Sequence, residues 1–287
     1  MKFKLIIILT LPLLFFSCKD TGKSYDYPFS KTEISENILM IGFGSDAITA
    51  IKTDSGIIII DSGCALSLTK IYRLIIENHF NCTDFTYLIN THAHYDHCAG
   101  NDVFNDAMII GHKNCEIEFT EQTVNIEQKT ISLEKVSRQY QTNLSKIEEF
   151  DKIESIKQVI KYRYAAKDYK KYSETKQGHT TFNDTLNLQS GSTEINLIYF
   201  GNLHSRSDIL IYIPQEKVLF TGDLFFSGGR ASVDNSITPD SLQWEFAAKQ
   251  IYLYLDNIEF IIGGHGQILE TEDLKSFFSN LNLNTKQ

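Results

Sequence analysis

The feature that most constrains this chain is a run from Thr91 to His97, reading THAHYDH, that follows an apolar, strand-like segment. It holds three histidines and one aspartate, namely His92, His94, Asp96 and His97. Neutral imidazole and ionised carboxylate are the usual nitrogen and oxygen ligands of zinc. Alternate residues of an extended or tightly turned segment point to the same side. The run therefore predicts a metal site, for which the rest of the chain must supply further ligands.

Three further candidate ligands lie in the second half of the chain, each after a strand-like run. His204 follows an apolar run that ends at Phe200, and Asp223 follows one that ends at Phe220. His265 lies among Gly263, Gly264 and Gly266, and these glycines permit tight or positive-φ backbone around the ring. Every candidate ligand thus follows a predicted strand.

The spacing of apolar residues predicts short strands that alternate with helices, which is typical of an α/β protein. Glycine-containing turns separate the runs, and the run at 57–60 is wholly apolar, as in a strand buried on both faces. The predicted strands are 38–41, 47–52, 57–60, 85–89, 108–110, 185–188, 194–200, 209–213, 218–220 and 260–262. The predicted helices are 66–80, 241–255 and 272–281.

A helical insertion is predicted between about residues 113 and 180. Up to Tyr172 this stretch is rich in Glu, Lys and Gln and lacks both Gly and Pro. Its apolar residues recur at steps of three and four from Leu133 to Ile160, which indicates helix. We expect one or two long amphipathic helices lying across the domain. A cover or a dimer surface is the expected role, and a lid is the alternative.

Composition and charge limit the kind of partner. The chain has 27 basic and 36 acidic residues, a net charge of −9, and no arginine-rich tract. Phosphate binding needs a cationic face, so a nucleic-acid partner is not expected. The 42% hydrophobic and 22% charged composition is that of a globular protein. We expect a small-molecule substrate and leave the oligomeric state open.

The first eighteen residues have the pattern of a secretory signal. Lys2 and Lys4 precede an apolar run of twelve residues from Leu5 to Phe16, shorter than the roughly 20 residues of a membrane-spanning helix. The run ends at Ser17 and Cys18, like a bacterial lipobox. We expect residues 1–18 to be the signal, with a lipid on Cys18 that anchors the chain to a membrane, 19–30 to be a tether, and 31–287 to be the folded domain. This predicts an exported protein, a periplasmic or outer-membrane lipoprotein of a bacterium. An ordinary cleaved signal and an uncleaved anchor are the alternatives.

The other four cysteines show no CxxC spacing and do not resemble zinc-finger ligands. They are Cys64, Cys82, Cys98 and Cys115. Four cysteines allow three disulfide pairings, and their redox state is left open.

Five motifs in order resemble the metallo-β-lactamase superfamily, over about Ile38 to Leu281. They are Ile60-Asp61-Ser62-Gly63, the THAHYDH run, His204 after a glycine-containing turn, Gly222-Asp223, and Gly263-Gly264-His265-Gly266. The resemblance implies a four-layer αββα sandwich of two mixed β-sheets, here with the helical insertion. It also implies a site for two metal ions at one edge of the sheets.

The resemblance assigns a role to each candidate residue. His92, His94 and His204 would hold the first metal, Asp96, His97 and His265 the second, and Asp223 would bridge them. Asp96 would also be catalytic, because it would orient a water and relay its proton. Asp61, Thr91 and Ser205 would hydrogen bond to ligand imidazoles, with plain turn residues as the alternative for Thr91 and Ser205. His112 and His179 are expected to be structural.

The implied activity is that of a hydrolase with two Zn²⁺, in which a hydroxide shared by the metals attacks an ester, lactone, thioester or lactam carbonyl. Iron and manganese are alternatives for the same ligands. Asp223 stands where the well-known β-lactamases have cysteine, which favours the broader hydrolases and makes a β-lactamase proper the alternative. An iron-dependent oxidoreductase of the same fold and a non-catalytic binding protein are the alternatives of another class. Specificity would come from 42–46, 225–235 and the insertion.

Overall fold

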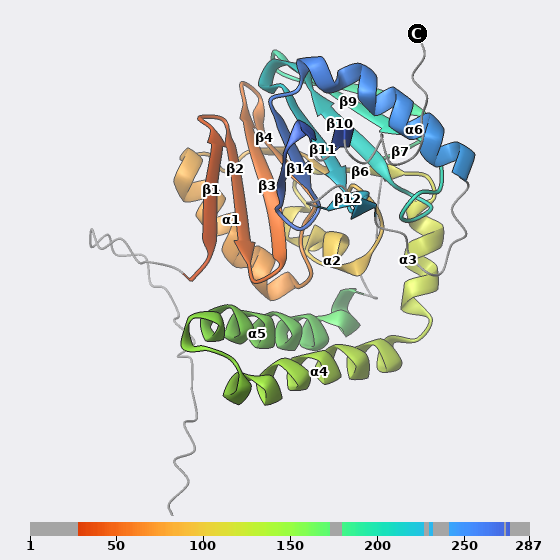
Figure 1. The fold of residues 1–287 in the computed structure, drawn as a ribbon. Helices are drawn as coiled ribbons and strands as arrows, with labels where there is room; N and C mark the ends of the chain where they lie inside the picture. The colour runs from red at the N-terminus through yellow and green to blue at the C-terminus, as the bar shows by residue number, and fades with distance from the viewer. Residues whose placement is uncertain (1–27, 173–179, 227–229, 232–240, 273, 276–287) are drawn as a thin grey trace, which may run out of the picture.

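Four layers of secondary structure, helices on either side of two packed sheets, make up the fold (Figure 1). The structure is a computed structural model, and it describes residues 28–172, 180–226, 230–231, 241–272 and 274–275. The predicted signal with Cys18, nearly all of the tether, His179 and most of the predicted closing helix lie outside these residues. The predictions made for them stay predictions. No described helix is long and apolar enough to cross a membrane.

The first sheet has seven strands in chain order, antiparallel from β1 to β4 and parallel from β4 to β7. Its strands are β1 (Ser30–Ser35), β2 (Ile38–Phe43), β3 (Asp46–Thr53), β4 (Gly56–Ile60), β5 (Phe85–Ile89), β6 (Met108–His112) and β7 (Thr180–Phe182). It is therefore a mixed sheet, as predicted.

The second sheet is also mixed. Its order is β15-β14-β11-β10-β9-β8, and only β11 and β14 pair in parallel. Its strands are β8 (Thr185–Ser190), β9 (Thr193–Tyr199), β10 (Ile209–Ile213), β11 (Val218–Gly222), β14 (Phe260–Gly263) and β15 (Ile268–Leu269). A small hairpin of β12 (Phe225–Phe226) and β13 (Arg230–Ala231) lies beside it.

Helices cover the outer faces of both sheets (Figure 1). α1 (Leu66–Phe80) and the insertion pack on the first sheet, and α6 (Ser241–Tyr254) covers the second. The short α2 (Tyr95–Cys98) contains part of the THAHYDH run. The insertion is α3 (Cys115–Thr123), α4 (Ile126–Asn143) and α5 (Glu149–Tyr172). The 3₁₀ turns are η1 (Asn101–Phe104), η2 (Leu144–Lys146), η3 (Pro214–Glu216) and η4 (Leu255–Asn257).

Three clusters of buried apolar side chains hold the layers together. One lies between the helices and the first sheet, one between the sheets, and one between the second sheet and α6. The run in β4 shows why the pattern does not alternate: Ile57 and Ile59 face the helices, whereas Ile58 and Ile60 face the other sheet. A strand buried on both faces needs apolar residues throughout. The predicted fold class is confirmed.

Two details differ from the sequence-based expectation. The strand β1 begins at Ser30, inside the predicted tether, and most of its residues are exposed or half-buried, so it lacks the apolar alternation that identifies a strand. The insertion contains two long helices, α4 and α5, as expected, and in addition the shorter α3. Neither break, near Asn125 or after η2, uses Gly or Pro, so the usual helix-breaking residues do not mark them.

Candidate metal centre

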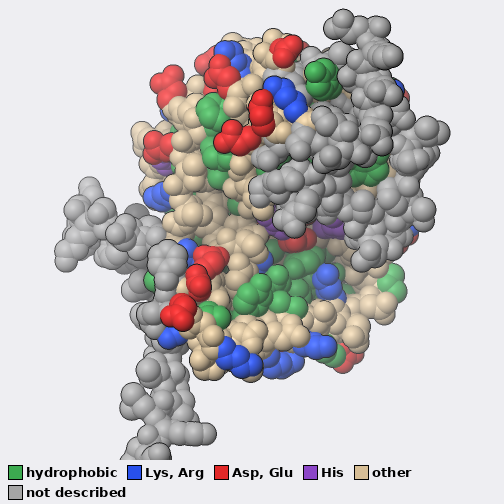
Figure 2. Space-filling view, viewed as in Figure 1, with side chains coloured by type: hydrophobic (Ala, Val, Ile, Leu, Met, Phe, Trp, Pro, Cys, Tyr) green, Lys and Arg blue, Asp and Glu red, His purple; other side chains and the backbone are tan. Residues whose placement is uncertain are grey.

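The candidate ligands gather at one edge of the sandwich, where strands from both sheets end. β4 and β5 end just before Asp61 and Thr91, and β11 and β14 end just before Asp223 and Gly264. Because parallel neighbours end at the same side of a sheet, the residues that follow them converge. Figure 2 shows histidine and acidic side chains reaching the surface together, between the sheets and the hairpin of α4 and α5.

The first group consists of His92, His94 and His204. Their ligand atoms lie within 4.8 Å of one another. Nδ1 of His94 is 3.1 Å from Nε2 of His204, and the ring of His92 lies edge-on to both, with centroids 4.5 and 5.0 Å away. Three imidazoles that point at one spot are the donor set of a zinc site that keeps a further position open.

The second group consists of Asp96, His97 and His265, whose ligand atoms also lie within 4.8 Å of one another. Asp96 and His97 are consecutive residues of α2, and His265 approaches from the loop after β14. Nε2 of His265 is 3.9 Å from Oδ2 of Asp96, and the rings of His97 and His265 are 5.2 Å apart. A carboxylate and two imidazoles are again a zinc donor set.

Asp223 lies between the two groups. Its Oδ1 is 3.4 Å from Nε2 of His97, and its Oδ2 is 3.1 Å from Nε2 of His265 and 3.8 Å from Nε2 of His204. The backbone leaves room for this carboxylate only because residue 264 is glycine. A Cβ on Gly264 would lie 2.3 Å from Oδ1 of Asp223 and 2.7 Å from Cε1 of His97.

Unpartnered atoms at this point indicate what the cluster can hold. Among the described residues, Nε2 of His92, Nε2 of His97 and Oδ1 of Asp223 are buried without a hydrogen-bond partner. These three residues form a group of their own within 4.8 Å. Leaving a buried polar atom unpaired is costly, and a shared cation would satisfy all three. The residues therefore fit divalent metal ions.

Asp61 and Thr91 orient two of the rings. Asp61 accepts hydrogen bonds from the backbone N–H and the hydroxyl of Thr91, at 2.7 and 2.8 Å, and pairs with Nδ1 of His97 at 2.8 Å. The Thr91 hydroxyl in turn lies 3.1 Å from Nδ1 of His92. Because both rings use Nδ1 here, the Nε2 atoms of both point into the cluster. Asp61 and Thr91 thus contact the imidazoles of two candidate ligands, and their role toward a metal stays a prediction.

The contacts of Ser205 are those of a turn residue, the alternative that was expected for it. Its hydroxyl donates to Asp208 Oδ1 at 2.7 Å, and Asp208 Oδ2 accepts from the backbone N–H groups of His204 and Ser205 at 2.8 and 2.6 Å. Asp208 therefore closes the loop that carries His204. Burial raises the pKa of this carboxyl group to about 6, although these hydrogen bonds pull it down.

Glu118 of α3 is a contact that sequence reasoning missed. It accepts from the backbone N–H of Arg206 at 2.6 Å and from the hydroxyl of Ser207. The Ser207 hydroxyl also accepts from the backbone N–H of Ala93 at 3.0 Å, which ties the His204 loop to the THAHYDH run. Glu118 is 7% exposed and lies 88 residues from Arg206 in the chain, so no local pattern could identify it.

A second group of residues that sequence reasoning missed supports α2. Asn90 donates a side-chain hydrogen bond to the backbone oxygen of His97 at 3.1 Å, and the backbone N–H of Ser62 donates to it at 2.8 Å. Asn101 donates to Asn90 at 2.8 Å and accepts from Ser62 at 2.7 Å. These polar side chains are fully buried, so the network fixes the backbone of His97.

The two groups differ in charge. Burial, together with neighbouring histidines, lowers the pKa of His92 and of His94, so their rings stay neutral. At His97 and His265 burial also opposes the charged form, but carboxylates outweigh it and raise the pKa. Asp223 is a main cause in both cases. The histidines of the second group therefore lie in the more negative environment.

His112 has a packing role. Its ring stacks on Tyr199 with centroids 3.6 Å apart, its Nε2 is 2.8 Å from the backbone oxygen of Asn183, and its Nδ1 accepts from the backbone N–H of Asn114. With both nitrogens engaged, the ring joins β6 to the loop after β7. Burial lowers the pKa of His112, which keeps it neutral.

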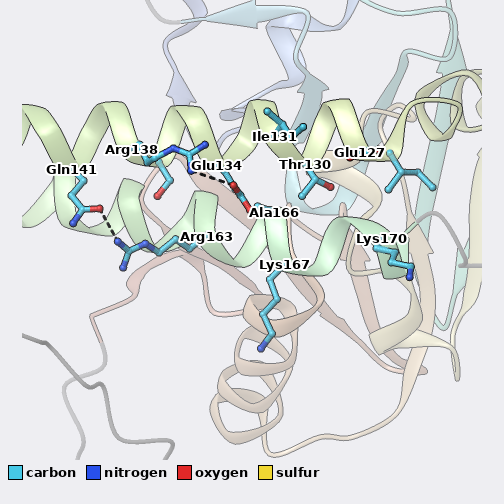
Figure 3. A pocket seen from close by; sticks show the side chains of 12 residues that line it. Glu127, Thr130, Ile131, Glu134, Arg138, Gln141, Arg163, Ala166, Lys167 and Lys170 are labelled. Atoms are coloured by element: carbon cyan, nitrogen blue, oxygen red, sulfur yellow. Dashed lines mark hydrogen bonds and ion pairs between the residues drawn. The ribbon is translucent and has the colours of Figure 1, made fainter.

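A groove of about 940 Å³ runs between α4 and α5, and none of its lining residues belongs to the candidate metal centre (Figure 3). Two of its arginines are engaged: Arg138 pairs with Glu134 at 3.4 Å, and Arg163 donates to Gln141 at 2.8 Å. Size alone therefore does not make this groove the functional site.

The chain is similar to known proteins in sequence and in structure. A family model described as the metallo-beta-lactamase superfamily matches residues 41–265. A type 2 metallo-beta-lactamase from Bacteroides fragilis is 23% identical over 91 residues, which are 32% of this chain and 36% of that protein. One from Bacillus cereus is 24% identical over 82 residues, 29% of this chain and 32% of that protein. The chain thus matches about a third of the length of these relatives.

Solved structures match over more of the chain. A metallo-beta-lactamase from Pontibacter korlensis has a TM-score of 0.60 at 15% identity, covering 89% of this chain and 100% of that one. A stereoselective inverting sec-alkylsulfatase from Pseudomonas sp. has a TM-score of 0.60 at 17% identity, covering 88% and 41%. At such identities the likeness is one of fold. Together with the family match over most of its length, it shows that the chain belongs to the metallo-β-lactamase superfamily.

Proposed function

We propose that the chain is a hydrolase that depends on two divalent metal ions, with zinc as the expected metal and an ester, lactone, thioester or lactam carbonyl as the group attacked. One observation carries the proposal: two three-residue groups lie on either side of Asp223, and among the described residues Nε2 of His92, Nε2 of His97 and Oδ1 of Asp223 are buried there without a hydrogen-bond partner. A binding protein without catalytic activity would not need to keep all of these candidate metal ligands.

The proposed ligands are those expected from the sequence. His92, His94 and His204 would hold the first ion, Asp96, His97 and His265 the second, and Asp223 would contact both. When bound, the two ions supply Lewis acidity that polarises a carbonyl and lowers the pKa of a water. The protein's own part is to keep the donor atoms fixed, through Asp61 and Thr91 on one side and Asp208 on the other.

Asp96 is the residue we propose for proton transfer. Its side chain is 28% exposed, against 8% for Asp223, so an incoming substrate reaches it more easily. Burial opposes its ionisation, but His97 and His265 outweigh that effect and lower its pKa. The group is therefore a carboxylate at neutral pH, and it can accept a proton from water and return it to the leaving group.

Two alternatives rest on other observations. The relatives matched in sequence are β-lactamases, which keeps a β-lactamase proper as the second candidate, although the match covers about a third of their length. An iron-dependent oxidoreductase would use the same donor types, and the metal content decides between it and a hydrolase. Because one neighbour in fold is an alkylsulfatase, sulfate esters also belong among the compounds to be tested.

The test is a metal analysis followed by a substrate panel. We expect about two zinc ions per chain in native mass spectrometry of protein produced with zinc. We also expect hydrolysis of at least one among a β-lactam, a lactone, a carboxylic ester and a thioester, with a phosphoester and a sulfate ester in the panel as non-carbonyl alternatives. EDTA should abolish the activity, and added zinc should restore it. Asp96→Asn is the matched variant for the proton-transfer role, with a loss of about 100-fold in kcat. A purified chain that binds no metal would contradict the proposal.

A further inference from the structure

The cationic side chains of α5 divide between two faces of the helix. Arg163, Lys167 and Lys170 line the outer groove between α4 and α5 (Figure 3). Lys161, in contrast, is only 5% exposed and does not line the groove. A lysine is rarely buried without a partner, because burial of its charge is costly. Lys161, on the inner face of α5, therefore needs partners for its buried charge.

The ammonium group of Lys161 contacts the turn between β2 and β3. Its Nζ donates to the hydroxyl of Ser45 at 2.6 Å and lies 4.3 Å from the ring centroid of Tyr162. Ser45 donates in turn to Oε1 of Gln158, one helical turn earlier on α5, at 3.2 Å. The helix packs tightly here, since a Cβ on Gly44 would lie 3.1 Å from Nε2 of Gln158. Two side chains of the insertion thus hold one serine.

The same serine contacts a candidate metal ligand. The backbone oxygen of Ser45 accepts a hydrogen bond from Nδ1 of His265 at 2.9 Å. This bond turns Nε2 of the ring toward Asp223, at 3.1 Å, and toward Asp96, at 3.9 Å. His265 lies among three glycines, which offer no side chains to pack against the ring. The orientation of the ring therefore depends on where the carbonyl group of Ser45 is held.

We propose that Lys161 is a positioning residue for the second metal: through Ser45 it holds the His265 ring in line with Asp96 and Asp223. The inference rests on the proposed function, because it assigns a role in binding the second ion. It gives the insertion a part in building the site beyond that of a cover. Partners that orient a ligating histidine typically change metal affinity about 10- to 100-fold when they are removed.

The first experiment titrates metal-free protein with Co²⁺ and follows its visible absorption, so that the two binding steps are resolved. For Lys161→Met we expect the second ion to bind about 10-fold more weakly and the first ion to bind as in the wild type. Lys161→Arg keeps a cation and a donor, and it should return the second step to within about 3-fold. Lys167→Met, on the outer face of the same helix, is the matched control and should change neither step.

Two outcomes would overturn the inference. One is a Lys161→Met protein that binds both ions as the wild type does. The other is equal weakening of both steps, which is what general loss of structure produces. Ser45→Ala is a second test that leaves Lys161 in place. It removes the hydroxyl but keeps the backbone oxygen, and it should weaken the second step by about 3-fold or more.

The second experiment needs no metal and separates this inference from the proposed function. In metal-free protein with ¹⁵N-labelled histidine, the Nδ1–H proton of His265 should be visible in NMR spectra because it is bonded to Ser45. That signal should shift or disappear in Lys161→Met and be retained in Lys167→Met. If the signal is unchanged in Lys161→Met, the inference is wrong whatever the metal content. A wild-type chain that binds fewer than two ions would instead contradict the proposed function.

Discussion

The two halves of the candidate metal centre are held in different ways. Burial and neighbouring histidines lower the pKa of His92 and His94 in the first half, whereas His97 and His265 in the second half lie against carboxylates that raise their pKa. The first half is a set of imidazole donors whose geometry depends on loops. The second half depends in addition on charge. A change in charge should therefore affect the second half first, and a change in a loop contact should affect the first half.

The insertion meets each half with a different group. At its start, Glu118 of α3 binds the loop that carries His204. Near its end, Lys161 of α5 binds the turn that contacts His265. An acidic residue, Glu118, thus supports the His204 loop of the first half, and a basic residue, Lys161, supports the turn beside His265 in the second half. Both contacts join segments roughly a hundred residues apart in the chain, so helices of the same insertion support both halves of the centre.

The largest effect is expected from Asp223, since it contacts both halves. Asp223→Ala removes a carboxylate that lies 3.4 Å from His97 and 3.1 Å from His265 but farther, 3.8 Å, from His204 of the first group. We expect affinity for the second ion to fall by at least about 100-fold, with the first ion retained, as measured by native mass spectrometry over a zinc series.

Asp223→Asn is the control for this variant, because it keeps the shape and one oxygen but not the charge. If charge decides the second half, the Asn protein should resemble the Ala protein in metal content while keeping a wild-type circular dichroism spectrum. Unchanged content in both variants would refute a bridging role for Asp223. Loss of both ions together would show that the two halves are one unit, and the comparison would fail.

The sequence predicts the proposed ligands better than it predicts their supports, and the reason is physical. His92, Asp223 and His265 stand at strand ends with polar or glycine-rich neighbours, so local patterns reveal them. The α/β class follows in the same way from apolar runs such as β4, whereas the four-layer sandwich was implied by the family resemblance. Glu118 and Lys161 instead lie on helices among other charged residues, and nothing local distinguishes a buried charge from a solvated one. Only the packing of distant segments decides which of them is buried.

A smaller effect is expected when the contact of α3 is removed. Glu118→Ala leaves the backbone N–H of Arg206 and the hydroxyl of Ser207 buried without their acceptor, which should cost about 2–4 kcal/mol of unfolding free energy. Because Ser207 also contacts Ala93, the first ion should bind about 10-fold more weakly. Urea unfolding with EDTA and the Co²⁺ titration measure the two effects.

Glu121→Ala is the matched control on the same helix. Glu121 pairs with the same residue, Arg206, at 2.8 Å, but its side chain is 56% exposed. A surface ion pair contributes only about 0–1 kcal/mol, so this variant should be close to the wild type in stability and metal binding. If Glu118→Ala is no worse than Glu121→Ala, then α3 does not support the His204 loop.

The smallest expected effect is on the pH dependence of stability, and it isolates the charge of Glu118 from its hydrogen bonds. Burial raises the pKa of Glu118 above its ordinary value, although its bonds to Ser207 and Arg206 pull it down. Between the ordinary and the raised pKa the folded state therefore holds more protons than the unfolded state. In that window the unfolding free energy falls as pH rises, and above it the penalty stays constant.

Glu118→Gln does not titrate, so its unfolding free energy should lose this downward slope. The amide side chain of the variant keeps one acceptor oxygen. Loss of the second hydrogen bond lowers the unfolding free energy by the same amount at every pH. Asp208, whose pKa is raised to about 6, contributes a slope of the same sign. The charges of Glu118 and Asp208 raise each other's pKa, so part of the Asp208 slope is also lost in the Gln variant and adds to the difference. We therefore expect the stability of the Gln variant relative to the wild type to increase with pH from about 4.5 upward in metal-free protein. Parallel curves from urea unfolding at each pH would show that Glu118 carries no such penalty, and the contrast between the two ends of the insertion would then rest on hydrogen bonds alone.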